Sequence, residues 1–453
     1  MATPRSPGAD NSAARVTIVG AGLAGSEAAL VLSASGTPVD LFEMRPGVSS
    51  PAHQTGLFAE LVCSNSLGAD RADSGKGLLK AELRTLGSNL LRLADRVRVP
   101  AGKALAVDRE AFGKSVTETV RARRNIRVVE AEARTIPDDP VVIIACGPIP
   151  SEKISGSIST LLGGMGLYFY DAISPIVDAS SLDTHRGFFA DRYGSGSGDY
   201  LNFPMTRPEW EAFFAALMSA RVVPAREFEE ERYFESCMPV EVLARRGEET
   251  LLFGPMRPVG LRDPRTGRIP HAVVQLRREN EAGTMFNLVG FQTKLTYPEQ
   301  ERVFSLIPGL GRAKFLRYGS VHRNSFLDAP RHLHSSMEYR NRKGLFFAGQ
   351  ITGVEGYVES IASGFVAAVS AAARVAGKEP PEFPEDSMIG ALMRHITTLP
   401  RGSFQPMNAN FGLLPLPTEG RKRERKERQA NRALSSIEDF RRRVFNFNPL
   451  CDT

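Results

Sequence analysis

The sequence predicts an α/β fold in which a smaller α+β domain is inserted into a larger domain built on a parallel sheet. Three observations lead to this prediction. An apolar strand, a helix of small residues and a second strand follow one another directly between residues 15 and 43. Further buried strand patterns occur in Ile126 to Glu130, Val141 to Ala145 and Gly344 to Phe347, with helical patterns between them. The segment from about 209 to 331 instead has short mixed strands and many turns.

The first strand, the helix and the second strand contain a glycine pattern in which each glycine has a structural reason. Gly20 permits a sharp turn out of the strand, Gly22 permits close approach of a pyrophosphate, and Gly25 permits close packing of the helix on the sheet. Glu43 ends the second strand, where a carboxylate can accept hydrogen bonds from ribose hydroxyls. We therefore predict a Rossmann-like dinucleotide site, the alternative being an empty α/β scaffold. The candidate cofactor-binding residues here are Gly20, Ala21, Gly22, Leu23, Ala24, Gly25, Glu43, Met44 and Arg45.

A second glycine-rich turn follows the strand Gly344 to Phe347 and leads into a helix expected over Val358 to Ala376. A free helix N-terminus of this kind can contact cofactor phosphates or rings, although an ordinary tight helix start has the same pattern. The candidate cofactor-binding residues of this turn are Gly349, Gln350, Gly353 and Tyr357. The turn after the buried strand, Cys146 to Pro148, is another place where such sheets approach their cofactor.

The remaining elements follow from hydrophobic spacing. Leucines at helical spacing predict an amphipathic helix over Gly77 to Leu93, and a further helix is expected over Asp108 to Arg124. In the inserted segment we expect the strands Leu251 to Phe253, Val273 to Leu276 and Phe286 to Val289.

At 453 residues the chain exceeds what one compact core usually serves. We expect a flexible N-terminus at 1–14, a discontinuous larger domain at 15–205 and 331–453, and the inserted domain at 206–330. Neither a signal-peptide stretch nor a membrane span is apparent, so we expect a cytoplasmic protein without membrane contact. The net charge of +6 permits a polyanionic partner.

The chain has four cysteines, Cys63, Cys146, Cys237 and Cys451, which are far apart and form no C-x-x-C pair. This pattern argues against a disulfide framework, a thiol redox motif and a cysteine metal site. Cys63 and Cys237 have polar or turn neighbours, whereas Cys146 ends an apolar strand and Cys451 lies near the C-terminus. The first two are the candidate reactive thiols, with a structural role as the alternative.

Only one dinucleotide fingerprint is present, because the glycines between Gly194 and Gly198 have the wrong spacing and precede a strand pattern. One nucleotide is then held permanently, and a nicotinamide, NADH or NADPH, visits as reductant. A permanently held dinucleotide that does chemistry is most often FAD.

A basic run, Arg421 to Arg428, contains six basic and two acidic residues. It can contact phosphates. It can equally be a solvated helix face, because Glu424 and Arg428 are four residues apart and can pair.

Ten ordered blocks along the chain carry a resemblance to one family. They are GAGLAGSEAA (20–29), FEMRP (42–46), AELVCSNSL (59–67), VPAGKALAVDR (99–109), YDAISPIV (170–177), CMPVEVLARRG (237–247), LLFGPMRPVGL (251–261), NLVGFQTKL (287–295), FFAGQITGVEGYVES (346–360) and FQPMNANFGLLP (404–415). Through these blocks the whole chain resembles the folate- and FAD-dependent methylenetetrahydrofolate-tRNA-(uracil-5-)-methyltransferases. Related GidA-like flavoproteins share the fold but are longer, and the FEMRP and CMPVE blocks argue against them.

The resemblance implies an FAD-binding domain of the glutathione-reductase type and a defined activity. A one-carbon unit passes from methylenetetrahydrofolate through reduced FAD to C5 of a uridine in the T-loop of tRNA, which gives 5-methyluridine. A cysteine thiolate adds to the uracil ring and makes C5 nucleophilic. The resemblance implies that Cys237 and Cys63 are catalytic, and we favour Cys237 as the nucleophile and Cys63 as its partner near the flavin.

The target base must be extruded from folded RNA, and phosphate contacts offset the cost of extrusion. Candidate contacts are the run Arg421 to Arg428 and the pair Arg245 and Arg246. The chain departs from the family pattern around Arg192 to Gly196, at Phe203 and at Ser66 to Gly68. Three alternatives stay open: a ribosomal RNA uridine as substrate, an NAD(P)H oxidoreductase without methyl transfer, and an RNA-binding module without catalysis.

Overall fold

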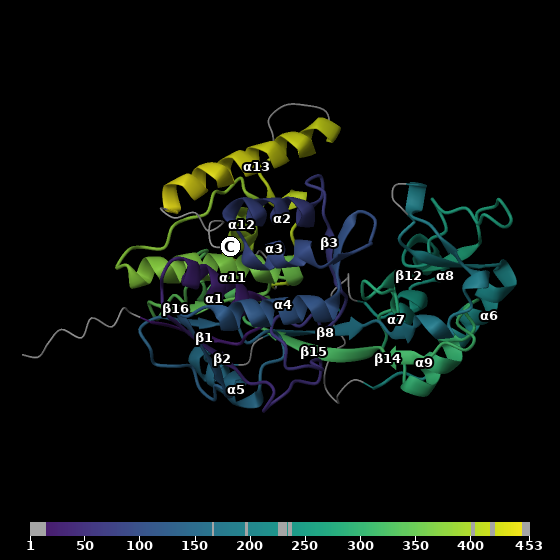
Figure 1. Cartoon of the computed structure of the whole chain (residues 1–453), viewed down its shortest axis with the longest axis horizontal. Coiled ribbons are helices and arrows are strands. Elements are labelled where there is room, and N and C mark those ends of the chain that lie inside the picture. The colour runs from purple at the N-terminus through teal and green to yellow at the C-terminus, as the bar shows by residue number, and fades with distance from the viewer. Residues whose placement is uncertain are drawn as a thin grey trace, which may run out of the picture.

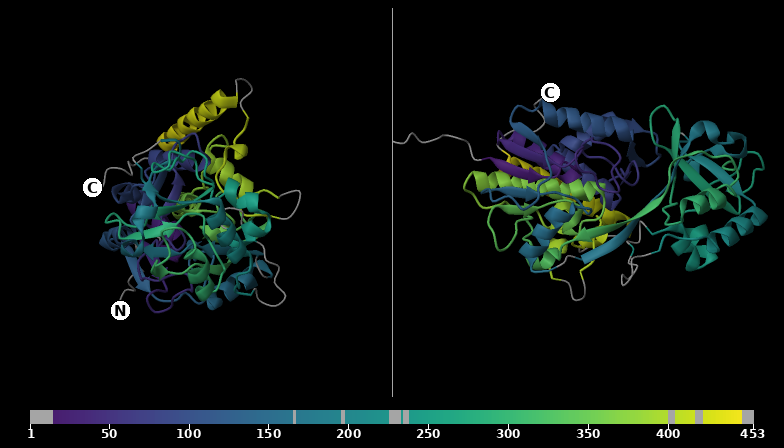
Figure 2. Two further views of the ribbon diagram at one scale, coloured as in Figure 1. Left: turned by 90° about the vertical axis from the view of Figure 1, so that its right-hand side faces the viewer. Right: turned by 90° about the horizontal axis from the view of Figure 1, so that it is seen from below.

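The computed structural model describes residues 15–164, 167–194, 198–224, 233, 238–399, 404–416 and 422–445. The N-terminus 1–14, for which we expect flexibility, lies outside the described residues. The described chain forms a larger and a smaller body, which lie beside each other in Figures 1 and 2. A two-stranded antiparallel ribbon runs between them, made by β8 (Leu167–Ile173) and β15 (Ser320–Phe326).

The larger body is built on a five-stranded parallel sheet with the order β16-β7-β1-β2-β6. Its strands are apolar and buried at the centre, as the strand patterns predict. Helices α1 (Leu23–Ala34) and α11 (Tyr357–Val375) pack against each other over this sheet. The strands are β16 (Leu345–Phe347), β7 (Val142–Ile144), β1 (Val16–Val19), β2 (Val39–Glu43) and β6 (Ile126–Glu130).

The prediction of a single helix over Gly77 to Leu93 is wrong in one respect, because the structure has two helices there. Helix α2 (Gly75–Leu86) ends at Gly87, whose φ of 85° lies in the left-handed region that glycine favours. Ser88 then caps α3 (Asn89–Arg96), and its side chain accepts a hydrogen bond from the Leu91 N–H. The helix expected over Asp108 to Arg124 is confirmed as α4 (Arg109–Ala122).

The smaller body is built on a six-stranded antiparallel sheet with the order β10-β11-β12-β13-β9-β14. One face of this sheet and helices α6 and α9 enclose a second apolar core around Trp210 and Phe291. The strands are β9 (Ile176–Asp178), β10 (Phe188–Phe189), β11 (Leu201–Met205), β12 (Ala272–Arg278), β13 (Met285–Leu288) and β14 (Phe315–Arg317). Its helices are α6 (Arg207–Met218), α7 (Val240–Arg245), α8 (Glu248–Phe253) and α9 (Tyr297–Phe304).

Two expectations for the inserted segment bear on this body. The strand expected at Leu251 to Phe253 is wrong, because these residues form the end of α8. Glu248 and Glu249 lie in the first turn of that helix, where acids complement the helix dipole, and Leu251 packs into the core. Strands β9, β10 and β11 lie at residues 176–205, ahead of the expected boundary at 206, and the division into domains stays a prediction.

The C-terminal segment returns to the larger body. Helix α12 (Met388–Thr397) packs on α2, and the long helix α13 (Lys422–Val444) lies across α2 on the outside (Figure 1). Smaller elements complete this body: α5 (Glu152–Leu162), α10 (Ala329–His332) and the three-stranded sheet of β3 (Ser66–Ala69), β5 (Ala104–Val107) and β4 (Arg98–Val99).

Among the described helices, α11 alone is long and apolar enough to cross a membrane, with a mean hydropathy of 1.3 in its most apolar window. However, 78% of that window is buried inside the fold, where α11 packs on α1 and α2. The composition of α11 is therefore that of a core helix.

Glu82 on α2 joins two distant segments, because its buried carboxylate accepts hydrogen bonds from the N–H groups of Met388 (2.7 Å) and Ile389 (2.9 Å) at the start of α12. We predict that Glu82→Ala lowers the free energy of unfolding by about 2 kcal/mol, because these N–H groups lose their acceptor. Urea unfolding followed by circular dichroism measures this loss. The matched control is Glu118→Ala, which removes an exposed glutamate from α4.

The same contact predicts a pH dependence. Burial raises the pKa of Glu82 from its ordinary 4.5 to about 8, so the folded state keeps a proton that the unfolded chain loses. The free energy of unfolding therefore falls as pH rises between these two values. We expect the difference between wild type and Glu82→Ala to be larger at pH 5 than at pH 8. An equal difference at both values would contradict the assignment.

Candidate functional site

The glycine turn after β1 meets three geometric requirements of a phosphate site. Gly20 has a φ of 101°, and a side chain there would lie 2.5 Å from the Ala145 carbonyl oxygen. A Cβ at Gly25 would lie 1.8 Å from the Gly20 carbonyl oxygen, so α1 meets the turn at a distance that only glycine permits. A Cβ at Gly22 would meet no atom within 4 Å, and no side chain caps α1. The N-terminus of α1 is thus available to a phosphate.

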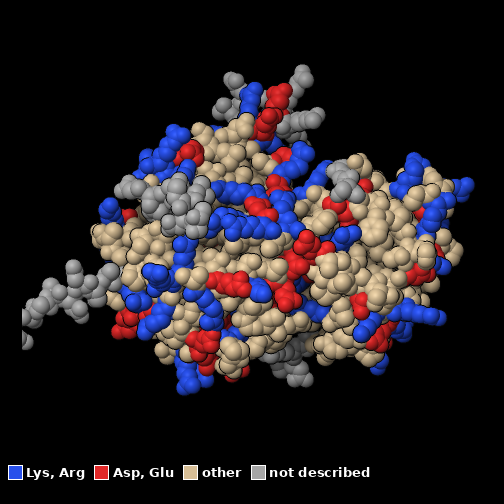
Figure 3. All heavy atoms as spheres, in the orientation of Figure 1, with Lys and Arg blue, Asp and Glu red and all other residues tan. Residues whose placement is uncertain are grey.

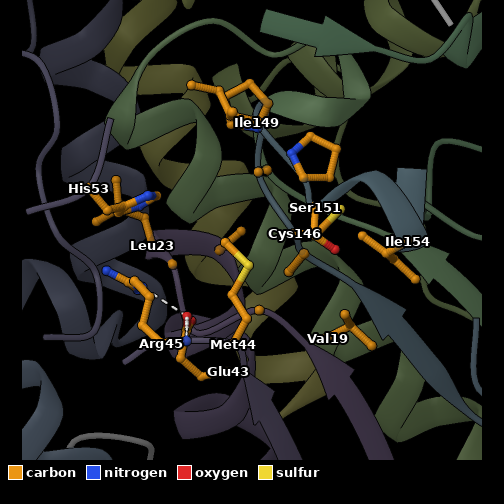
Figure 4. Close-up of a pocket in the computed structure, with 18 of the residues that line it drawn as sticks. Val19, Leu23, Glu43, Met44, Arg45, His53, Cys146, Ile149, Ser151 and Ile154 are labelled. Carbon is orange, nitrogen blue, oxygen red and sulfur yellow. Dashed lines mark hydrogen bonds and ion pairs between the residues drawn. The ribbon is translucent and has the colours of Figure 1, made fainter. Parts of the chain in front are cut away.

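Glu43 supplies the acidic group at the end of β2. Its carboxylate accepts hydrogen bonds from the Ala21 N–H (2.9 Å), the Arg45 N–H (3.0 Å) and Arg45 Nε (2.8 Å). Burial by itself would raise the pKa of Glu43, but the hydrogen bonds and the charge of Arg45 outweigh it and lower the pKa. The ionised carboxylate is a hydrogen-bond acceptor beside the glycine turn, and Figure 4 shows it next to Arg45.

These groups line one cavity, in which the ends of β1 and β2, the turn 145–151 after β7 and the start of α11 meet (Figure 4). Ala21 and Gly25 are packed behind it, and Gly353 faces the Phe404 ring, which a Cβ there would approach to 2.5 Å. Whether any of these residues binds a cofactor stays a prediction. The predicted residues that line the cavity are Gly20, Gly22, Leu23, Ala24, Glu43, Met44, Arg45, Gly349, Gln350 and Tyr357.

The cavity wall also contains residues that the sequence did not single out, among them His53, Glu60 and Ser360. Burial first, and then the charge of Arg45, lower the pKa of His53 to about 4, so its imidazole is neutral. The His53 Nδ1 lies 2.6 Å from the Ser50 hydroxyl. A single histidine in a loop has no local pattern that would reveal this position, whereas the turn after β7 was recognisable from its strand.

Gln350 is oriented from behind by a buried carboxylate. The Gln350 Nε2 donates to Glu355 Oε2 at 2.7 Å, and Glu355 is 5% exposed. Burial, and next the nearby Asp171, raise the pKa of Glu355 to about 8. The direction in which the Gln350 amide faces the cavity is thereby linked to the protonation of Glu355.

Cys63 lies beside the cavity and is held at three atoms. Its N–H donates to the Tyr357 hydroxyl at 2.7 Å, its thiol donates to the Ala172 carbonyl at 3.8 Å, and its carbonyl accepts from Arg109 Nη2 at 3.1 Å. Burial, and next the charge of Asp171, raise the pKa of the Cys63 thiol to about 12. Near pH 7 the group is therefore a neutral thiol.

Cys237 lies outside the described residues, so the structure does not bring the two predicted catalytic cysteines together or separate them. The chain directly after it is anchored: buried Glu241 on α7 accepts hydrogen bonds from the Thr293 hydroxyl (2.8 Å) and the Lys294 N–H (2.8 Å). Cys146, which we interpret as a bystander, lines the cavity, and burial raises the pKa of its thiol to about 12.

A second cavity adjoins the first, and both share Ile149 in their walls. Cations and aromatic rings line it or lie beside it. Lys294 Nζ lies 5.7 Å from the centre of the Tyr233 ring, and the Arg323 guanidinium lies 4.2 Å from the centre of the Tyr168 ring. Such a wall suits a flat ligand that carries negative charge. The lining residues are Pro51, Ile149, Tyr170, Val223, Pro224, Tyr233, Lys294, Val321, His322 and Arg323.

Residues 15–379 match the family model described as glucose inhibited division protein A. Two crystal structures of Aquifex aeolicus GidA superpose with TM-scores of 0.71 and 0.70 at 17% sequence identity. The superpositions cover 97% and 98% of this chain and 76% and 75% of GidA. At this identity the likeness concerns the fold alone. The family model covers more than half of the chain, so the class of the protein is that of the GidA family model.

Curated relatives narrow the class to one family. Proteins named methylenetetrahydrofolate-tRNA-(uracil-5-)-methyltransferase TrmFO from Sulfurihydrogenibium sp. and Exiguobacterium sp. are 50% and 52% identical, over 95% and 94% of this chain and 98% and 99% of theirs. The protein of that name from Heliobacterium modesticaldum is 54% identical, over 94% of this chain and 97% of its own. The chain belongs to the TrmFO family.

The raised pKa of Cys63 predicts its reactivity. Alkylation requires the thiolate, so the rate for Cys63 rises about tenfold per pH unit and shows no plateau up to about pH 10. Iodoacetamide labelling followed by peptide mass spectrometry measures this rate. An early plateau between pH 7 and 9 would mean that the thiol ionises in its ordinary range.

Proposed function

We propose that this protein transfers a one-carbon unit from methylenetetrahydrofolate, through FAD, to C5 of the T-loop uridine in tRNA, giving 5-methyluridine. One observation carries the proposal: a cavity at the glycine turn that is lined by Tyr357 and adjoins Cys63, in a chain at least half identical over nearly its full length to relatives named methylenetetrahydrofolate-tRNA-(uracil-5-)-methyltransferase.

The residues of the first cavity fit FAD. The uncapped N-terminus of α1 would take the pyrophosphate, Glu43 the ribose hydroxyls, and the segment from Gly349 to Tyr357 the ring system. When bound, FAD supplies a carrier for the one-carbon unit and for the electrons that reduce it to a methyl group. NADH or NADPH would reduce the flavin, and the protein would act in the cytoplasm.

The proposed division of labour between the thiols follows from the chemistry of uracil. C5 is a poor nucleophile until a thiolate adds at C6, forms a bond to carbon and leaves the negative charge on the enolate. The high pKa of Cys63 makes it a poor source of thiolate, which supports Cys237 as the nucleophile toward the base. Cys63 would then remain the neutral neighbour of the ring, with its N–H held by Tyr357.

The second cavity is a suitable place for folate and the extruded base. Lys294 and Arg323 can face the folate carboxylates, and Tyr170 and Tyr233 offer rings for stacking. The cavity adjoins the FAD site at Ile149, so a ligand in it would lie next to the flavin.

RNA contacts are better placed on the smaller body than on α13. Arg425, Arg428 and their neighbours on α13 lie among acids, and Arg428 reaches Glu424 at 4.0 Å, while Arg421 lies outside the described residues. In the described part of the smaller body, the arginines that have no carboxylate within ion-pair distance include four between residues 245 and 268, three of them exposed. Figure 3 shows Lys and Arg side chains along the upper right of this body. The four are Arg245, Arg257, Arg262 and Arg268.

The decisive experiment supplies FAD-loaded protein with NADPH, methylenetetrahydrofolate and unmodified tRNA or ribosomal RNA, followed by mass spectrometry of the nucleosides. We expect 5-methyluridine in tRNA. If 5-methyluridine formed only in ribosomal RNA, ribosomal RNA would replace tRNA as the proposed substrate. NADPH oxidation without any methylated base would favour the oxidoreductase alternative.

We predict that Cys237→Ala abolishes methylation and leaves FAD bound, because the thiolate acts on the base and not on the cofactor. Flavin absorbance after gel filtration and nucleoside analysis measure the two effects. Cys146→Ala is the matched control, since it removes a cysteine that lies at the FAD cavity and has no role in the proposed reaction. An active Cys237→Ala protein would remove this cysteine from the mechanism.

We predict that the double variant Arg262→Gln, Arg268→Gln binds tRNA about tenfold more weakly at low salt, with a salt slope smaller by about 2, because two phosphate contacts are lost. Filter binding across a salt series measures both. The control is Arg96→Gln, Arg124→Gln, which removes two exposed arginines of the larger body that have no acidic partner among the described residues. Equal losses of tRNA affinity in both double variants would indicate that binding depends on total charge and not on this surface.

A further inference from the structure

We propose that Arg109, Glu279 and Arg277 are positioning residues, which hold the Cys63 loop in place across the boundary between the two bodies. The inference rests on the proposed function for the catalytic importance of Cys63, but the contacts stand independently of it. We call this set of contacts, together with Ser64 and Asn65, the interbody clamp.

Arg109 forms the first half of the interbody clamp. It begins α4 in the larger body, and its guanidinium contacts the Leu61 carbonyl through Nη1 and the Cys63 carbonyl through Nη2 at 3.1 Å. The same guanidinium binds Glu279 Oε2 through Nε at 3.0 Å and Nη2 at 2.8 Å. Glu279 follows β12 of the smaller body and is 1% exposed. One side chain thus joins the Cys63 loop to the end of a strand in the other body.

Arg277 forms the second half from the opposite side. It lies on β12, is 6% exposed, and donates to Asn65 Oδ1 through Nε at 2.9 Å and to the Ser64 hydroxyl through Nη2 at 2.7 Å. Asn65 is fully buried and donates in turn to the carbonyls of Val107 and Arg278, both at 2.9 Å. The two residues after Cys63 are therefore held by the smaller body directly.

Burial and charge make these contacts strong. Hydrogen bonds to charged groups are worth more than neutral ones, and a buried charge that loses its partner is penalised further. Burial alone would lower the pKa of Arg109, but the charge of Glu279 and its hydrogen bond to the guanidinium outweigh burial, and the pKa is raised. The guanidinium therefore stays charged. A loop held at four of its positions, 61, 63, 64 and 65, has little freedom to move its thiol away from Tyr357.

The consequence is that the position of Cys63 depends on where the smaller body sits. This goes beyond the proposed function, which assigns the thiol a place at the flavin but no means of keeping it there. Loosening the interbody clamp should expose the thiol to reagents and misplace it for catalysis, without disturbing the α1 turn and Glu43, which belong to β1, α1 and β2 and not to the clamp.

The test measures the alkylation rate of Cys63 by iodoacetamide labelling and peptide mass spectrometry on the FAD-loaded full-length protein. We expect Glu279→Gln to raise this rate about tenfold, since the clamp loses a charged hydrogen-bond partner. Cys146, in the same molecule, should keep its wild-type rate. Methylation kcat should fall while KM for tRNA and the FAD content stay unchanged, a split that general destabilisation would not produce.

The assignment to one pair is tested by a double-mutant cycle with Arg109→Lys, which keeps the charge but loses the fork that spans two carbonyls and Glu279. The double variant should react no faster than the faster single variant, because both changes break the same contact. Arg277→Lys tests the second half of the interbody clamp independently. It also replaces Glu279→Gln as the test if that variant does not fold.

The matched control is Glu338→Gln, which breaks a buried Arg–Glu pair of the same kind, Arg374 with Glu338 at 2.7 Å, away from the Cys63 loop. It should leave Cys63 alkylation unchanged. The inference is overturned if Glu279→Gln and Arg277→Lys leave the rate within about twofold of wild type, or if Cys63 and Cys146 speed up together. If methyl transfer is absent but the alkylation rates change as expected, the interbody clamp stands and the proposed function fails.

Discussion

The site depends on one close approach, that of α1 to the end of β1, where Gly25 meets the Gly20 carbonyl at a distance that excludes any side chain. The effect of this approach reaches far beyond the phosphate turn. A Cβ at Gly364 would lie 2.3 Å from the Ala24 carbonyl oxygen, so α11 crosses α1 directly beside the same turn. Tyr357, at the start of α11, then holds the Cys63 N–H. The close contact of α1 with the end of β1 and that of α11 with α1 thus connect the glycine turn to the Cys63 thiol.

Buried glutamates fix the surrounding segments by a common device. Each accepts hydrogen bonds from the backbone N–H groups of a segment distant in sequence, so a glutamate side chain adds to the local serine cap, Ser88 for α3 and Ser387 for α12. Glu27 does this for Asn89 and Leu90 at the start of α3, and Glu82 does it for α12. Burial raises the pKa of both, to about 7 and about 8, because the charged form is poorly solvated. These groups hold the helices around the sheet at a cost in solvation that the N–H donors offset in part.

The sequence predicted what depends on local chain geometry. The turn from Gly20 to Gly25, Glu43 and the second glycine turn could all be found because their spacing is set by a strand ending beside a helix. The strand expected at Leu251 to Phe253 failed because three apolar residues are compatible with a strand or a helix turn. The break at Gly87 and Ser88 was missed because leucine spacing continues across it.

What the sequence could not predict is contact between distant residues. Arg109 and Glu279 are 170 positions apart, and neither belongs to a pattern that names its partner. His53 became part of the cavity wall only because its loop folds beside Arg45 and Glu60. Such pairs are determined by how the two sheets are placed relative to each other, which hydrophobic periodicity does not encode.

The environment of the Cys63 thiol depends on contacts to both bodies and to the ribbon between them. Its geometry comes from Tyr357 on one body and the interbody clamp to the other, whereas its pKa is raised by burial and by Asp171, which lies on β8 of the connecting ribbon. The paired strand β15 carries Arg323, which lines the second cavity. A shift of the smaller body would therefore alter the thiol's position, its protonation and the neighbouring ligand cavity together. Residues on β8, β12 and β15 determine the position of the thiol, its protonation and the neighbouring cavity. The chemistry of the larger body therefore depends on the placement of the smaller one.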